Sequence, residues 1–207
     1  MRGRFISLEG GEGAGKSTQL KALAAALRGR GIEVVETREP GGSPGAEAIR
    51  ALLLQGDVER WTAETEALLF AAARSDHVAR TIRPALARDA WVLCDRFLDS
   101  SIAYQGLVGG VGAEAIRQLH QVGSQGFLPD RTLLLRLEDE EAAARAQTRD
   151  ASGADRFGAR DAAYHMRINA AFAQLAAEDP GRYRVIEASG PAEGVTTRLL
   201  AALEDLL

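Results

Sequence analysis

Residues 10–17, near the amino terminus, have the types and spacing needed to hold the phosphate chain of a nucleotide. Their sequence, Gly-Gly-Glu-Gly-Ala-Gly-Lys-Ser, fits the pattern G-x-x-x-x-G-K-[ST] and stands between an apolar run and a helical pattern. Glycines let successive backbone N–H groups turn towards phosphates, and the amino terminus of the next helix adds positive potential. The Lys16 ammonium would reach the β- and γ-phosphates, and the Ser17 hydroxyl would ligate Mg²⁺. The predicted ATP-binding residues are Gly10, Gly11, Glu12, Gly13, Ala14, Gly15, Lys16, Ser17 and Thr18.

A second candidate for this chemistry lies where the apolar run 91–94 ends. Asp95 closes the run, and an acidic residue at the carboxyl end of such a strand can support Mg²⁺ directly or through water. Ser17 and Asp95 are therefore the predicted metal residues. A phosphate-binding loop indicates only that a nucleoside triphosphate binds, so the acceptor must be identified from other segments.

These residues require a sheet to position them, and the chain has the pattern of one. Short apolar runs alternate with longer helical patterns, which is typical of an α/β protein with the P-loop NTPase fold, a five-stranded parallel sheet covered by helices on both faces. The expected strands are 5–9, 33–37, 91–95, 132–137 and 184–188. The expected helices are 16–29, 64–86 with a stop or bend at Pro84, 113–124, 161–177 and a last one from near Pro191 to the end of the chain.

Composition limits the classes of partner. The chain has 207 residues with 46% hydrophobic and 26% charged residues, which favours one compact domain over 1–207. A formal net charge of -4 gives no basic excess for a nucleic-acid polymer. The single cysteine, Cys94, cannot form an internal disulfide and is expected to be a buried thiol in a reducing compartment. No apolar run approaches the roughly 18 residues that span a bilayer, so we expect a cytoplasmic protein without a membrane segment.

One segment does not fit a strand or a helix. Residues 148–160 are polar, rich in charge and glycine, and poor in large apolar side chains. Such a composition predicts a mobile surface loop, and we place a short lid at about 146–160.

Four motifs together resemble one family. Residues 95–106, DRFLDSSIAYQG, are similar to the DR-x(3)-SS-x-AYQG segment of bacterial thymidylate kinases. The segments 9–18, 37–42 and 66–74 resemble the same family in the same order, as does Pro129-Asp130 before the fourth strand. The resemblance implies a nucleoside monophosphate kinase domain that transfers the γ-phosphoryl group of Mg·ATP to dTMP, giving dTDP and ADP, in the pathway to dTTP for DNA synthesis. It also implies a homodimer.

The resemblance assigns the acceptor site residue by residue. Phe70 would stack on the thymine ring while Arg74 hydrogen-bonds its O4 edge, and a spacing of four places both on one helix face. Glu12 would face the sugar and its 3′-hydroxyl, and Arg96 and Arg50 would hold the dTMP phosphate. The full set implied for dTMP is Glu12, Arg38, Pro40, Arg50, Phe70, Arg74, Arg96, Ser100, Ser101, Tyr104 and Gln105.

The resemblance also concerns the catalytic arginine. Phosphoryl transfer needs positive charge near the β/γ-bridge, and residues 10–17 contain no arginine. The chain is therefore similar to family members that supply this arginine from the lid, with Arg149 as the best match, Arg156 as a second contributor and Arg145 not separable from them. The predicted catalytic residues are Lys16, Arg96, Arg149 and Arg156.

Several alternatives stay open at the level of sequence. Residues 10–17 could be a glycine-rich turn that opens a helix, Phe70 a core residue, Arg74 and Arg50 surface residues, and the lid a solvated loop. A kinase for UMP, CMP or AMP would share the phosphate loop and lid but read another base. A P-loop switch that hydrolyses nucleotide slowly and a kinase for thymidine itself are two further alternatives.

Overall fold

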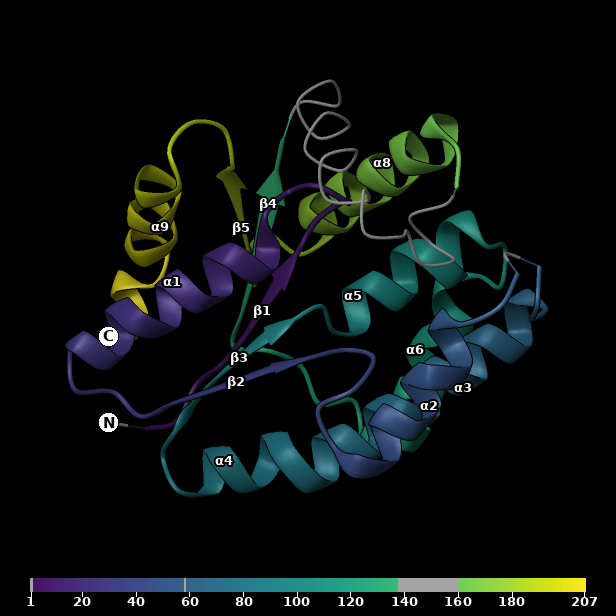
Figure 1. Cartoon of the computed structure of the whole chain (residues 1–207), viewed down its shortest axis with the longest axis horizontal. Helices are drawn as coiled ribbons and strands as arrows, with labels where there is room; N and C mark the ends of the chain where they lie inside the picture. Colours follow the sequence, from purple (N-terminus) through teal and green to yellow (C-terminus); the bar gives the residue numbers. More distant parts are fainter. Residues whose placement is uncertain (1, 58, 138–159) are drawn as a thin grey trace.

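A five-stranded parallel sheet forms the centre of the protein (Figure 1). The structure is a computed structural model, and it describes residues 2–57, 59–137 and 160–207. The strands, in the order β2-β3-β1-β4-β5 across the sheet, are β1 Phe5–Glu9, β2 Val34–Arg38, β3 Trp91–Asp95, β4 Arg131–Arg136 and β5 Tyr183–Glu187. The predicted sheet is confirmed, and each strand bound agrees with the expectation to within one residue.

Helices cover both faces of the sheet because successive strand residues point to opposite sides. In β3, Trp91 and Leu93 pack into one apolar cluster, whereas Val92 and Cys94 pack into another. The first cluster lies under α1 (Lys16–Gly29) and α9 (Ala192–Ala201), which Figure 1 shows side by side. The second lies under α3 (Ala63–His77), α4 (Arg83–Ala87), α5 (Leu98–Ser101), α6 (Ala113–Ser124) and α8 (Ala162–Glu178).

The long helix expected at 64–86 contains a π-helical insertion. The helix α3 continues into the π-helical segment Val78–Ile82 and then into α4. Pro84 stands in the first turn of α4, and the preceding Arg83 N–H donates to Val78 O, five residues back. Since proline has no N–H to donate, the wider turn accommodates it without ending the helix. The bend or stop predicted at Pro84 is therefore a local change of helix type just before it.

Two helical segments were not expected from the sequence. Helix α2 (Pro44–Leu54) begins at Ser43, whose Oγ accepts from Ala46 N–H at 3.4 Å. The short α5 continues into a π-helical segment at Ile102–Val108. The last helix, expected to run to the end of the chain, instead ends at Ala201, and a 3₁₀ turn follows at Glu204–Leu206. Short segments such as α5 offer too few residues for a helical period to be visible.

The strand order brings three loops to one edge of the sheet. The central β1 lies next to β3, which lies next to β2, and the carboxyl ends of these parallel strands meet at the same edge. The phosphate-binding loop follows β1, the segment from Glu39 follows β2, and Arg96 follows β3. Ligands of open α/β sheets bind at this edge, so the topology alone assembles the candidate site there. Among the described helices, none is long and apolar enough to cross a membrane.

Candidate active site

The phosphate-binding loop has the expected backbone geometry. Gly15 precedes α1 with φ = 82°, in the left-handed region that suits glycine. Lys16 is buried, and its Nζ donates to Gly10 O at 3.1 Å and to Gly11 O at 2.7 Å. Burial and the nearby guanidinium of Arg96 lower the pKa of Lys16 to about 8. The Lys16 ammonium is thus bound to the carbonyl groups of the same loop that is predicted to bind the phosphates.

The predicted metal residues lie within one hydrogen bond of each other. Ser17 Oγ donates to Asp95 Oδ2 at 2.5 Å, which joins the start of α1 to the end of β3. A hydroxyl and a carboxylate are oxygen ligands of the kind that Mg²⁺ prefers. The described residues contain no group of three or more His, Cys, Asp or Glu side chains suited to a metal.

Two adjoining cavities open at this edge of the sheet. The first, the Phe70 cavity, is lined by Glu12, Glu39, Pro40, Arg50, Leu54, Phe70, Arg74, Arg96, Phe97, Ser100, Ser101, Tyr104 and Gln105. The second, the P-loop cavity, is lined by residues 12–19, Arg38, Glu39, Arg50, Asp95, Arg96, Ala188, Gly190, Ala192 and Val195. The cavities share Glu12, Glu39, Arg50 and Arg96. The Phe70 cavity thus brings together every residue that the sequence suggested for dTMP except Arg38, which lines the P-loop cavity instead.

Arg74 is fixed in a buried site on α3. Its Nε donates to Glu39 Oε2 at 2.7 Å, and its Nη2 donates to Ser101 Oγ at 2.7 Å and to Phe97 O at 3.3 Å. Among the described residues, Nη1 of this guanidinium has no hydrogen-bond partner. Only 3% of Arg74 is exposed, so the surface alternative is wrong. The side chain is a fixed donor at the wall of the Phe70 cavity.

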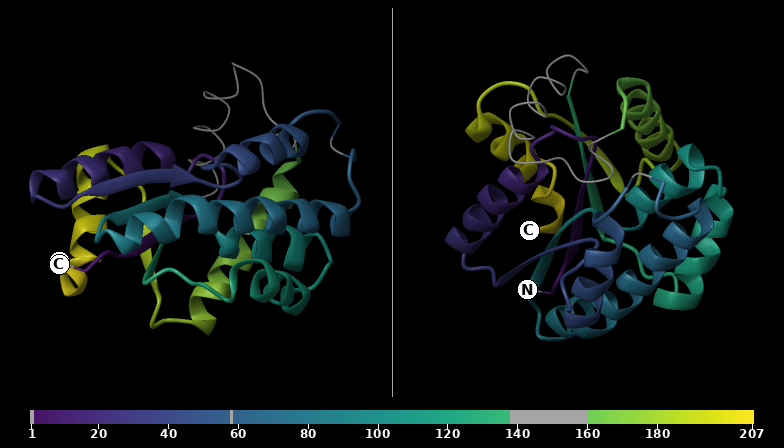
Figure 2. Two further views of the ribbon diagram at one scale, coloured as in Figure 1. Left: turned by 90° about the horizontal axis from the view of Figure 1, so that it is seen from below. Right: turned by 45° about the vertical axis from the view of Figure 1, so that its right-hand side comes forward.

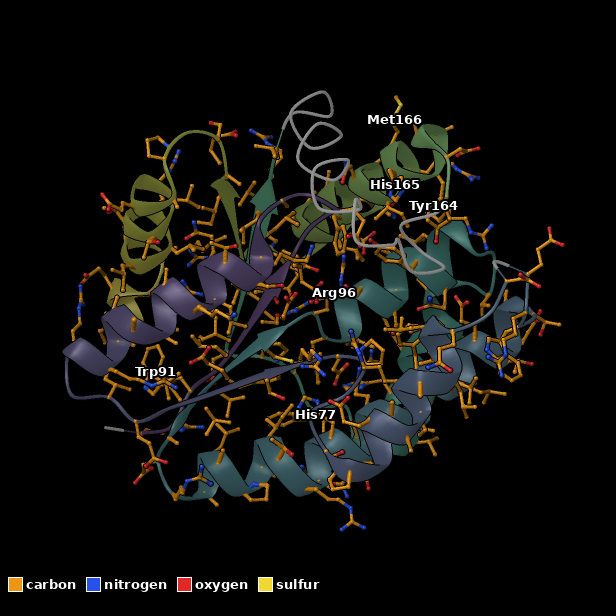
Figure 3. All side chains as sticks on the ribbon, viewed as in Figure 1. His77, Trp91, Arg96, Tyr164, His165 and Met166 are labelled. Carbon is orange, nitrogen blue, oxygen red and sulfur yellow. The ribbon has the colours of Figure 1, made fainter. Side chains whose placement is uncertain are left out.

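Arg96 joins the two cavities. It lies between β3 and α5, near the middle of the molecule in Figure 3, and has φ = 70°. Its Nη2 donates to Glu12 Oε1 at 2.7 Å, and its Nη1 donates to Gly10 O and Ser100 Oγ, both at 3.1 Å. Glu12 is therefore paired and partly buried in this structure, and the guanidinium connects the phosphate-binding loop to the acceptor side.

The other predicted residues lie in less enclosed positions. Arg50 Nη1 donates to Pro40 O at 2.6 Å, which fixes it at the wall of both cavities. Arg38 is more than half exposed and pairs with Glu47 at 3.1 Å. Gly10 and Gly11 do not line the P-loop cavity but a third hollow beside α8. Cys94 is buried as expected, and its Sγ donates to Arg96 O at 2.9 Å.

Predicted lid residues lie outside the described part of the chain. These residues are Arg145, Arg149 and Arg156, and they fall between residues 137 and 160. The lid and its catalytic arginines therefore stay predictions.

Comparison with known proteins decides the family. The sequence matches the family described as Thymidylate kinase over residues 8–199. The chain belongs to the thymidylate kinase family. A thymidylate kinase of Rhizorhabdus wittichii is 63% identical over 207 residues and covers all of both chains. One from Caulobacter vibrioides is 49% identical over 206 residues, which is 100% of this chain and 96% of that protein.

A solved structure supports the same conclusion. The crystal structure of thymidylate kinase from Ehrlichia chaffeensis superposes with a TM-score of 0.80 at 30% identity, covering 99% of this chain and 100% of that one. As a thymidylate kinase, the protein phosphorylates dTMP by ATP-dependent phosphoryl transfer. Kinases for other acceptors and a slow nucleotide switch are thereby set aside.

Sequence analysis of this thymidylate kinase missed the role of Glu9, at the end of β1. Its carboxylate is fully buried and accepts from Phe97 N–H at 2.8 Å and from Ser100 Oγ at 2.6 Å. Burial and repulsion from Asp99 raise the pKa of Glu9 to about 8, although Ser100 and Arg96 oppose the shift. An acidic last residue in an otherwise buried strand was the signal that could have indicated a buried carboxyl group.

A buried chain of hydrogen bonds behind Arg74, here called the relay, was also missed; it runs from Glu39 through His77 to Thr37. Glu39 Oε1 hydrogen-bonds His77 Nδ1 at 3.0 Å, and His77 Nε2 hydrogen-bonds Thr37 Oγ1 at 2.7 Å. Burial alone would raise the pKa of Glu39, but Arg74 and His77 hold it below its ordinary value. The motif at 37–42 contains both Thr37 and Glu39, yet nothing in it shows that their partners lie on α3.

Proposed function

We propose that in this thymidylate kinase the Phe70 cavity binds dTMP, the P-loop cavity binds ATP, and phosphoryl transfer takes place where the two meet. The observation that carries the proposal is their shared wall of Glu12, Glu39, Arg50 and Arg96. A shared wall allows donor and acceptor to be aligned without an intervening barrier, and alignment is the main requirement of this reaction.

Base recognition is proposed to depend on Phe70 and Arg74. Both line the Phe70 cavity from α3, where a spacing of four directs them to one face. Phe70 supplies an apolar face for the ring, and Nη1 of Arg74 supplies a donor for the O4 acceptor of thymine. Ser101 and Gln105 complete this end of the cavity, and Tyr104 lies beside the position of the deoxyribose.

The charged residues at the shared wall are proposed to serve the phosphates. Arg96 and Arg50 would bind the acceptor phosphate with planar guanidinium groups, and Glu12 would receive the 3′-hydroxyl. Lys16 would exchange its two carbonyl partners for the β- and γ-phosphates. Arg149 and Arg156 are proposed to neutralise the charge on the migrating group from the lid, which would close over ATP and expel water.

Mg²⁺ is proposed as the ion that accompanies ATP. Ser17 and Asp95 would hold it, because their oxygens already lie 2.5 Å apart. The ion would supply charge neutralisation on the phosphates, while the protein aligns the two nucleotides. A single domain over 1–207 and a cytoplasmic location stay predictions.

A homodimer through α2, α3 and α6 is proposed as well. The helix α3 packs against α2 on one side and α6 on another, and both views in Figure 2 show the three helices gathered at one end of the molecule. Each has a large exposed apolar side chain, with 43% of Leu52, 55% of Leu68 and 87% of Val122 accessible to solvent. Apolar side chains on neighbouring helices are typical of surfaces that are covered in an oligomer.

Replacement of Arg74 tests the acceptor site. We expect Arg74→Lys to lower kcat/KM for dTMP by about 10- to 100-fold, because lysine keeps a charge near Glu39 but loses the fixed planar donors. ADP release would be measured with dTMP, dUMP, UMP, CMP, AMP or GMP as acceptor. Arg80→Lys is the matched control, since Arg80 is exposed just after the same helix. Unchanged dTMP turnover in Arg74→Lys would contradict the assignment of the Phe70 cavity.

A further inference from the structure

Gln105 forms a hydrogen bond with Glu66, an acidic residue that does not line the Phe70 cavity. Its Nε2 donates to Glu66 Oε1 at 2.9 Å. Gln105 is 2% exposed and lies in the π-helical segment that follows α5, whereas Glu66 lies in the first turn of α3. Gln105 lines the Phe70 cavity and Glu66 does not. The hydrogen bond to Gln105 therefore gives Glu66 a route by which to act on a ligand in the cavity.

The chemistry of this contact fixes the orientation of the amide. A glutamine amide can present either its NH₂ group or its carbonyl oxygen in a given direction, and the two orientations have nearly the same shape. A carboxylate only accepts hydrogen bonds, so the NH₂ group must face Glu66. The carbonyl oxygen, on the other side of the amide, is then the group offered away from Glu66.

We propose that Glu66 is a positioning residue for base selection, which orients Gln105 so that its carbonyl accepts a hydrogen bond from N3–H of the acceptor pyrimidine. The proposal rests on the assignment of the Phe70 cavity to dTMP. Thymine and uracil carry a proton on N3, whereas N3 of cytosine is an acceptor. A fixed acceptor at Gln105 thus favours the imide bases, and it complements the fixed donor that Arg74 offers to O4.

In this proposal, each of the two side chains that bind the base is held in one orientation by a hydrogen bond to a carboxylate. Glu39 fixes Arg74 as a donor, with 2.7 Å between Oε2 and Nε. Glu66 fixes Gln105 as an acceptor. A base with the reversed pattern, an amino group at C4 and an unprotonated N3, would meet a donor opposite its donor and an acceptor opposite its acceptor. Buried groups left unpaired in this way reject a ligand strongly.

The test compares binding of dTMP and 5-methyl-dCMP, which keeps the methyl group and reverses the hydrogen-bonding edge. Dissociation constants would be measured by calorimetry without ATP, for the wild type and Glu66→Gln. Glutamine at position 66 can donate as well as accept, so it releases the amide of Gln105. We expect the preference for dTMP to fall about tenfold, the equivalent of one hydrogen bond. Turnover should show a higher KM for dTMP with little change in kcat.

Matched variants separate positioning from a structural role. Glu64→Gln removes an acid from the same helix turn at an exposed position, so it controls for the loss of charge at the start of α3. Glu66→Met removes the acceptor without adding a donor, so its preference for dTMP should fall less than that of Glu66→Gln. Thermal unfolding of all variants would establish that each is folded.

Each outcome has a definite meaning. A tenfold loss of preference in Glu66→Gln, with Glu64→Gln unchanged, supports the proposal. A wild-type preference that survives intact in Glu66→Gln overturns the role of Glu66 and leaves the acceptor site in place. A wild type that binds both nucleotides equally overturns base reading by Arg74 and Gln105, and the proposal with it.

Discussion

At the scale of single residues, carboxyl groups that are not proposed to touch the substrates fix the positions of the side chains that are. Glu39 is 6% exposed and accepts from Arg74, and its other oxygen bonds His77. A buried carboxylate with two such partners is stabilised only while both are present, because an unpaired charge in a site without water is costly. The fixed position of Arg74 therefore depends on Glu39 as much as on the helix that carries it.

Glu39→Gln tests this dependence. The amide keeps the size of the side chain but loses the charge, so we expect the free energy of unfolding to fall by about 1–3 kcal/mol and KM for dTMP to rise. Denaturant unfolding and steady-state kinetics measure the two effects. Glu36→Gln is the control, because Glu36 pairs with Arg28 at a partly exposed position. Equal stability of the two variants would contradict the role given to Glu39.

At the scale of elements, the turn after β2 has no room for a side chain. Gly42 has φ = 84°, and a Cβ atom there would collide with Thr37 and His77. The turn therefore closes directly against the relay that supports Arg74. Gly29, at the end of α1, contrasts with it, because a Cβ atom there would meet nothing within 4 Å.

Two glycine replacements should have opposite effects. We expect Gly42→Ala to lower the free energy of unfolding by about 1–3 kcal/mol, since it adds strain and displaces the relay. We expect Gly29→Ala to raise it by about 0.5–1 kcal/mol, since alanine favours a helix and limits the unfolded chain. Thermal and denaturant unfolding would measure both. Gly42→Ala at wild-type stability would show that the turn tolerates a side chain.

The elements also show what could be predicted from sequence. The strands and the helices 16–29 and 113–124 were predictable, because their apolar residues recur at the period of the element. The segment after α5 was not, since seven residues of π-helix at Ile102–Val108 have no such signal. The place of Phe70 and Arg74 in the cavity was implied by the family resemblance, with which their spacing of four on one helix agrees. The partners Glu39 and Glu66 could not be found, because each contact joins residues 35 or 39 positions apart.

At the scale of the whole molecule, one buried proton makes stability depend on pH. Burial, then Asp99, raise the pKa of Glu9 from 4.5 to about 8. The folded state therefore keeps a proton that the unfolded chain releases above 4.5. Its contribution to stability is complete below 4.5 and is lost progressively as the pH rises to about 8.

Glu9→Gln should remove this dependence. Between pH 5 and pH 8 we expect wild-type stability to fall relative to the variant by about 1.4 kcal/mol per pH unit, the effect of one proton. Denaturant unfolding at several pH values would measure the difference. A constant difference across this range would show that Glu9 is ionised in the folded protein.

The proposed dimer can be tested on the surface of α6. We expect Val122→Glu to convert the dimer into a monomer of 22.1 kDa, because the substitution would bury a charge at the interface. Sedimentation equilibrium would measure the mass. Val185→Glu is the control, since Val185 on β5 is 50% exposed and lies away from α2, α3 and α6. A wild type of 22.1 kDa would contradict the dimer.

On the proposed assignment of the two cavities, the ion pair between Arg96 and Glu12 would also link the binding of the two nucleotides energetically. Both residues line both cavities, and the pair is closed at 2.7 Å. A phosphate that binds Arg96 on either side alters the contact that the other nucleotide meets. Thermodynamic reciprocity then requires ATP and dTMP to change each other's affinity by the same factor. Under that assignment, the first nucleotide to bind would change the affinity of the site for the second.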